Sequence, residues 1–203
     1  MKRLFSLAAF LFALCGLALS AEPKKPAGEG TANAPYQLAC YEELLWLAGN
    51  AASVSNAYMD LANDIDASAS FDEEEFFPGI TAYGIHFNGR GHELKNLKFE
   101  LVKTEYYGSY DFSGSLFKRI NNSELTDFAL SHMSLAQDIR RSSLHKIVYS
   151  VTNDYYFLAR AINRTNFESI EINAEVSNKD LVRSGVLAFE IYESTITPFR
   201  GSG

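Results

Sequence analysis

Apolar residues recur along this chain in a degenerate repeat. In the segment 85–99, IHFNGRGHELKNLKF, the apolar residues Ile85, Leu94 and Leu97 surround a glycine-rich turn. The same apolar spacing returns at Leu116, Leu125 and Phe128, then at Leu158, Phe167 and Ile170, and in part at Leu187, Ile196 and Phe199. Stacked repeats of short strands bury one continuous core and are typical of a solenoid. The pattern therefore predicts an all-β repeat protein.

The repeat also predicts which side chains stack on one another. We expect Leu94, Leu125 and Phe167 to form one interior column, because parallel strands place equivalent residues above each other. We expect Leu97, Phe128 and Ile170 to form a second column. The interval from the second repeat to the third is longer than the others, so the surplus residues should leave the coil in an excursion within 137–153.

A short helix is predicted before the repeats. The segment 41–48, YEELLWLA, has apolar residues at helical spacing, and Glu42 and Glu43 lie in its first turn, where acidic side chains favour the helix dipole. Gly49 follows as a helix end. We expect this helix to cap the first coil, which would otherwise expose an apolar cross-section. The alternating segments 36–38 and 56–66 predict strands on either side.

The composition divides the chain into three parts. Residues 1–20 have a positive start, an apolar centre and a small-residue cleavage site, which predicts a secretory signal peptide. Residues 21–35 are rich in Pro, Gly and Ala, so we expect a flexible leader. Residues 36–203 form the repeat domain. No capping segment follows Phe199, so we expect an open last coil, and the chain either self-associates through it or is part of something longer.

The net charge and the cysteine content limit the classes of binding partner and the cellular location that fit this chain. The formal net charge is −7, which makes a nucleic-acid partner a poor fit because phosphate binding needs clustered Lys and Arg. Cleavage of 1–20 would leave no membrane span, and Cys40 would be the only thiol, so no intrachain disulfide is expected. The sequence predicts a secreted, periplasmic or cell-surface location.

Five segments in this order resemble the opening of a known class of bacterial proteins. They are YQLACYEELLWLA, YMDLANDIDAS, FPGI, FNGRGHELKNLKFE and SGSLFKRINNSELTDFAL. They are similar to secreted and cell-surface right-handed parallel β-helix repeat proteins, including GLUG-motif and adhesin-like proteins with a pectate-lyase-like fold. The resemblance implies a right-handed parallel β-helix of about four coils over 36–203, with an N-terminal capping helix. It covers residues 36–130 best and does not specify an activity, because this fold hosts adhesins, lyases, hydrolases and spacers.

Two sets of residues are candidate functional sites. An aromatic-rich set would suit stacking on sugar rings if it is exposed, and would be ordinary core if it is buried. Its members are Tyr106, Tyr107, Tyr110, Tyr155 and Tyr156. The alternative is a catalytic pair of carboxylates, Asp127 and Glu168, on neighbouring coils, with Arg140 beside them.

Metal chemistry has weaker support in the sequence. Asp60, Asp64, Asp66 and the acidic run 72–75 offer the oxygen ligands that calcium takes, although a solvated acidic loop explains them equally simply. We therefore expect no cofactor, with calcium as the one alternative. The leading hypothesis is an exported, non-enzymatic surface module that binds a polysaccharide or another surface protein, and the alternative is a carbohydrate-active enzyme.

Overall fold

The computed structural model describes residues 21–50, 53–68, 76–98, 103–106, 109–112, 115–131, 135–151, 159–174 and 188–202. This part of the chain is mostly parallel β-sheet with one short helix, α1 (Tyr41–Gly49), as the sequence predicts. The predicted signal peptide, residues 1–20, lies outside the described residues.

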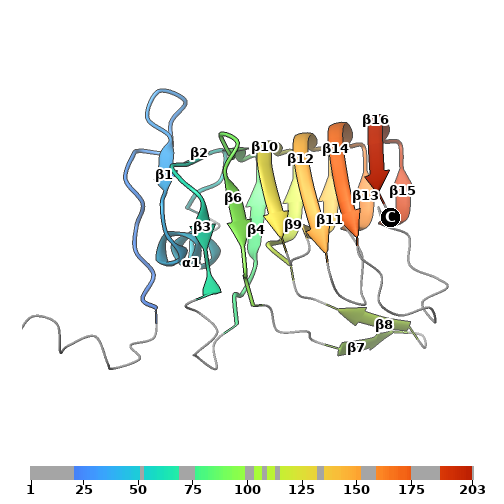
Figure 1. The fold of residues 1–203 in the computed structure, drawn as a ribbon, viewed down its shortest axis with the longest axis horizontal. Coiled ribbons are helices and arrows are strands. Elements are labelled where there is room, and N and C mark those ends of the chain that lie inside the picture. Colours follow the sequence, from blue (N-terminus) through green and yellow to red (C-terminus); the bar gives the residue numbers. More distant parts are fainter. Residues whose placement is uncertain are drawn as a thin grey trace, which may run out of the picture.

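Two parallel sheets account for most of the strands (Figure 1). The first sheet has the order β1 (Tyr36–Leu38), β2 (Tyr58–Leu61), β5 (His86–Asn88), β10 (Glu124–Ser131), β12 (Ser143–Val151), β14 (Asn166–Ala174) and β16 (Thr195–Ser202), and it also includes β3 (Ile65–Asp66) and β6 (Glu93–Lys95). The second sheet contains β4 (Ile80–Tyr83), β9 (Phe117–Asn121), β11 (Ala136–Arg140), β13 (Ala159–Asn163) and β15 (Ala188–Tyr192). A separate antiparallel pair joins β7 (Lys103–Tyr106) to β8 (Ser109–Phe112).

The chain passes from the second sheet to the first through a repeated corner. The corner residue has a positive φ at Asn122, Arg141, Arg164 and Glu193, and Gly84 occupies the same place one turn earlier. A buried hydroxyl follows three of these residues, at Ser123, Ser142 and Thr165. The Ser123 N–H donates to the Ser142 Oγ at 3.1 Å, and the Ser142 hydroxyl donates to the Arg140 carbonyl at 2.9 Å. These bonds hold a left-handed backbone that L-residues otherwise disfavour.

A second positive-φ position bends the long strands of the first sheet. It falls at Asp127 in β10, Lys146 in β12 and Ser169 in β14. As a result, β10 pairs with β5 before the bend and with β6 after it. The glycine-rich turn between β5 and β6 lies against this bend, where a side chain on Gly89 would collide with Phe128.

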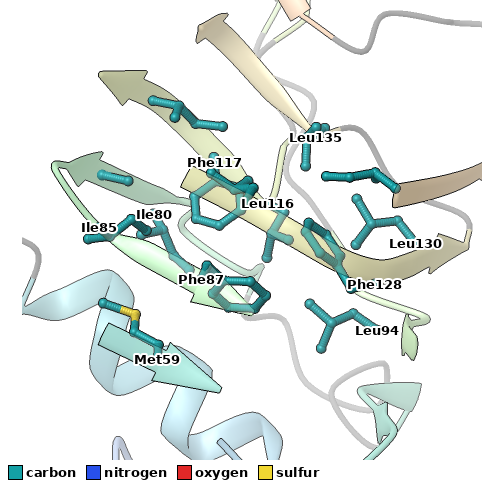
Figure 2. Packing of buried hydrophobic residues seen from close by; sticks show 14 of the residues in the cluster. Met59, Ile80, Ile85, Phe87, Leu94, Leu116, Phe117, Phe128, Leu130 and Leu135 are labelled. Atoms are coloured by element: carbon teal, nitrogen blue, oxygen red, sulfur yellow. The ribbon is translucent and has the colours of Figure 1, made fainter. Parts of the chain in front are cut away.

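The core lies between the two sheets (Figure 2). Phe87 of the first sheet makes edge-on contacts with Phe117 of the second sheet at 5.9 Å and with Phe128 at 5.2 Å between ring centroids. Successive strands continue this packing as a buried column that includes Met59, Phe87, Leu125, Leu144 and Phe167. The buried apolar side chains described for both sheets therefore belong to one cluster.

The register predicted from the apolar repeat is wrong in two respects. Leu94 pairs with Leu130 rather than stacking on Leu125, whose neighbours in the column are Phe87 and Leu144. The predicted excursion within 137–153 is also wrong, because β11 and β12 fill most of it and belong to the two sheets. Leu125 and Phe167 do share a column, as do Phe128 and Ile170, but β12 lies between them. The degenerate spacing missed β12 because its turn is shorter than the others.

The helix packs at the β1 end of the sheets (Figure 1). Leu44 and Leu47 are buried in the core cluster, and Leu45 packs against it. The Glu43 carboxylate accepts the Ala39 N–H at 2.7 Å and forms an ion pair with Lys24 at 3.0 Å. The helix therefore packs its apolar side chains on the core at this end, and its role as the cap of a solenoid stays a prediction.

The segment 21–35 also makes contacts in this region. The Lys24 N–H donates to the Glu42 carbonyl at 3.0 Å, and Ala27 forms a bridge with Gln37. Its flexibility in solution stays a prediction. At the other end, β15 and β16 are the outermost described strands of their sheets. Self-association through them likewise stays a prediction.

Candidate functional site

The outer side of the first sheet carries two neighbouring columns of polar residues, here called the polar strip. Each strand contributes a polar–apolar–polar triplet whose central residue is buried in the core, so the two polar residues occupy outward positions. The first column contains Tyr58, His86, Glu124, Ser143 and Asn166, and the second contains Asp60, Asn88, Thr126, His145 and Glu168. The strip therefore crosses β2, β5, β10, β12 and β14 without interruption.

Histidine–carboxylate pairs link adjacent strands across the strip. The His86 Nδ1 lies 3.1 Å from the Glu124 Oε2, which joins β5 to β10. The His145 Nδ1 lies 2.8 Å from the Glu168 Oε2, which joins β12 to β14. All four side chains are substantially exposed to solvent. The pairs orient each imidazole, and such exposed pairs add little stability.

An aromatic ring supports one of these pairs. Tyr58 stacks on His86 with ring centroids 4.1 Å apart and planes only 6° from parallel. His86 is therefore held by the tyrosine on one strand and by Glu124 on the other. This arrangement gives the strip a flat, ordered patch with both ring and carboxylate surfaces.

The acidic residues beside the strip are also paired across strands. The Arg90 Nη2 lies 2.6 Å from the Asp60 Oδ2, and this carboxylate raises the pKa of Arg90. The Asp64 carboxylate accepts the Glu93 N–H and contacts the His92 Nδ1 at 3.1 Å, which together lower the pKa of Asp64. These carboxylates therefore hold neighbouring chain turns together.

The pKa of the next aspartate, Asp66, is lowered strongly. The Asn96 side chain donates to the Asp66 Oδ1 at 2.9 Å, and this bond, with those from Ser68, lowers the pKa of Asp66 to about 2. The carboxylates proposed for calcium thus have protein partners. Among the described residues, no group of three or more His, Cys, Asp and Glu side chains is arranged to hold a metal ion. The acidic run 72–75 lies outside the described residues.

The structure does not bring the predicted catalytic residues together. Asp127 is at the bend of β10 and Glu168 is in β14, so β12 separates the two strands. The placement of these acids on neighbouring coils is therefore wrong, because the sequence repeat overlooked β12. Arg140 ends β11 in the second sheet, where its Nη2 lies 3.5 Å from the Asp138 Oδ2.

The predicted tyrosine set is only partly described. Tyr106 lies in β7 and pairs with Ser109, and Tyr110 lies in β8 and pairs with Glu105. This antiparallel pair is separate from the two parallel sheets (Figure 1). Tyr107, Tyr155 and Tyr156 lie outside the described residues. A binding role for the set stays a prediction.

Sequence reasoning missed the polar strip, although a signal for it exists. The triplets Tyr58-Met59-Asp60, His86-Phe87-Asn88, Glu124-Leu125-Thr126, Ser143-Leu144-His145 and Asn166-Phe167-Glu168 all match in the observed register. A search for polar–apolar–polar triplets after a turn would have found β12. The search for widely spaced apolar residues did not.

Comparison with known proteins assigns neither a family nor a function to this chain. No protein-family model matches the chain, and neither a curated protein nor a solved structure matches it. In the part of the chain that the structure describes, no helix has the length and apolar character required to cross a membrane. The functional argument therefore depends on the geometry of this chain alone.

Proposed function

We propose that this chain is an exported, non-enzymatic cell-surface or envelope module that binds a partner through the polar strip. The observation that carries this proposal is the ordered row of outward polar side chains across five parallel strands. A regular row of hydrogen-bonding groups at the strand spacing of about 4.8 Å suits an extended ligand better than a small molecule.

The proposal includes the finer fold, a right-handed parallel β-helix. Three features support it: both sheets are parallel, the chain alternates between them, and each passage uses the same positive-φ corner. A parallel strand that returns to its own sheet by a crossover is nearly always right-handed.

Cysteine cross-linking tests this arrangement of coils. Ser143 and Asn166 are directly paired on β12 and β14, within the Cα separation that a disulfide spans. S143C/N166C should form an intrachain disulfide under mild oxidation, detected by mass spectrometry. E124C/N166C is the control, because β12 lies between its two strands. Equal cross-linking of both variants would overturn the coil order.

Several features favour binding over hydrolysis. Glu124 and Glu168 are each paired with a histidine on an adjacent strand, on an exposed face of mixed charge that includes Tyr58. Glycoside hydrolysis needs two carboxyl groups that flank one bond. Asp127 and Glu168 do not lie on adjacent strands, and Arg140 belongs to the other sheet.

The chemistry of the strip suits a polysaccharide or a polar protein surface. Hydroxyl, amide, imidazole and carboxylate groups alternate along it, so it offers both donors and acceptors. The Tyr58 ring, beside His86, adds an apolar surface of the kind on which sugar rings stack.

A panel of purified polysaccharides and bacterial surface proteins tests the proposed function. We expect the purified protein to bind one of them, and E124A/N166A to weaken that binding about tenfold, as the loss of two contacts would. R119E, on the second sheet, is the matched control and should bind normally. Unchanged melting temperatures would show that the variants fold. Normal binding by E124A/N166A would exclude the strip, and release of reducing or unsaturated sugar ends would contradict a non-enzymatic role.

A further inference from the structure

A group of basic residues, here called the basic patch, lies on the second sheet and its corners. Lys118 and Arg119 belong to β9, Arg140 ends β11, and Arg141 and Arg164 are corner residues. All five are exposed. They stand out in a chain whose formal net charge is −7.

Three of the five cations form no ion pair with a described residue, although Asp138 lies directly opposite Arg119 in the strand register. Arg140 contacts Asp138 at 3.5 Å, and Arg164 forms an ion pair with Glu193. Among the described residues, no carboxylate forms an ion pair with Lys118, Arg119 or Arg141. The patch therefore presents an excess of cations to a partner.

The strand register keeps the patch compact. Asn121 at the end of β9 pairs with Arg140, which pairs with Asn163 next to Arg164. The basic residues thus lie on three successive strands, which are about 4.8 Å apart. Tyr83, with 40% of its surface exposed, pairs with Asn121 at the edge of the same group.

Arg119 and Arg140 lie on the second sheet, across the core from the polar strip, whereas Arg141 and Arg164 lie at the corners between the two sheets. Ile120 and Ile139, next to the basic residues in β9 and β11, point into the same apolar cluster as Phe87 and Leu125 of the first sheet. The strip side carries Asp60, Glu124, Glu168 and Glu171, so the two outer sides differ in charge.

We infer that the basic patch docks the protein on an anionic lipid surface. Clusters of four to eight Lys and Arg residues bind acidic headgroups through the surface potential of the bilayer. An exposed tyrosine beside such a cluster suits the membrane interface. Docking through the second sheet would leave the polar strip on the first sheet free for a second partner. The inference does not depend on the function proposed for the strip.

Vesicle sedimentation tests the inference. The purified protein should sediment with vesicles of phosphatidylglycerol and phosphatidylcholine, and high salt should release it because screening weakens the attraction. Vesicles of phosphatidylcholine alone measure any apolar contribution from residues 1–20. R119E/R141E should lower the partition coefficient more than tenfold, and R119Q/R141Q should do so by a smaller factor. E124A/N166A, on the first sheet, should bind as the native protein does.

Three results would overturn the inference. The first is no sedimentation with anionic vesicles at low salt. The second is equal partitioning of the native protein and R119E/R141E, with both folded by circular dichroism. The third is retention on immobilised heparin without vesicle binding, which would assign the patch to a soluble polyanion. Different variants test the polar strip and the basic patch, so a negative result for lipid docking does not contradict partner binding by the strip, and the reverse also holds.

Discussion

The two outer sides of this protein use their charged residues differently. On the first sheet, His86 and His145 each contact a glutamate on a neighbouring turn. Asp60 forms an ion pair with an arginine on a neighbouring turn. On the second sheet, Arg119 and Arg141 form no ion pair among the described residues. The register places Asp138 opposite Arg119, but the Asp138 carboxylate contacts Arg140 instead. Paired charges order the surface, and unpaired charges leave it ready for a partner.

The core couples both sides, so breaking it should produce the largest effect. Phe87 is 1% exposed and contacts Phe117 and Phe128, and thus both sheets. F87A should lower the free energy of unfolding by about 3–5 kcal/mol, because it leaves a cavity between the sheets. Chemical denaturation measures this change. F76A, at a residue with 40% exposure, is the control and should cost about 0.5 kcal/mol or less.

Removal of a corner hydrogen bond should produce the next largest loss of stability. Ser142 is 3% exposed, accepts the Ser123 N–H and donates to the Arg140 carbonyl. S142A should cost about 2 kcal/mol, because it leaves a buried N–H and a carbonyl without this partner. S55A removes an exposed hydroxyl bond to Tyr83 and should cost much less. Equal denaturation midpoints for the two variants would mean that the buried hydroxyls do not hold the corners.

A matched pair of arginines compares the two sides directly. Arg90 pairs with Asp60, whereas Arg141 belongs to the basic patch, and their φ values are 55° and 49°. Replacement by alanine therefore meets nearly the same backbone strain at both positions. R90A should cost about 1 kcal/mol, because it leaves the largely buried Asp60 without its cation, and R141A should stay within about 0.5 kcal/mol. If thermal and chemical denaturation show similar losses of stability for R90A and R141A, the two sides do not differ in this way.

The smallest effect concerns pH. The pKa of Asp66 is lowered to about 2, first by the Asn96 side chain and then by Ser68. A carboxyl group with a lowered folded pKa stabilises the protein above its unfolded pKa of about 3.9, and this contribution is lost as the pH falls from about 4 to 2. N96A should raise the pKa of Asp66 toward its ordinary value, as measured by carboxyl NMR titration. An unchanged titration would show that the Asn96 bond does not form in solution.

Local sequence patterns predicted individual elements well. The segment 41–48 combines helical apolar spacing with acidic residues in its first turn, and α1 occupies it with one further residue. The alternating segments 36–38 and 56–66 became β1, β2 and β3. These elements depend on the order of neighbouring residues, which the sequence states directly.

The pairing between turns was harder to predict. Leu94 was assigned to the column of Leu125, but it pairs with Leu130. Pairing Leu94 with Leu125 and pairing it with Leu130 both place leucines inside the core, so burial alone does not distinguish the two registers. The error then moved Asp127 and Glu168 onto neighbouring strands in the prediction, and it hid the pairing of His145 with Glu168.

The burial of apolar residues in repeated short strands follows from the order of residues along the chain, because alternation fixes which side of a strand faces the core. The helix before the repeats follows from the helical apolar spacing of 41–48 in the same way. The order of neighbouring strands depends on the fold, since turns of different length can present the same apolar spacing. The observed order places β12 between β10 and β14, joins His86 to Glu124 and His145 to Glu168, and brings Arg119 and Arg140 onto adjacent strands of the second sheet. The candidate surfaces consist of contacts between residues far apart in the chain, and those contacts exist only once the register is set.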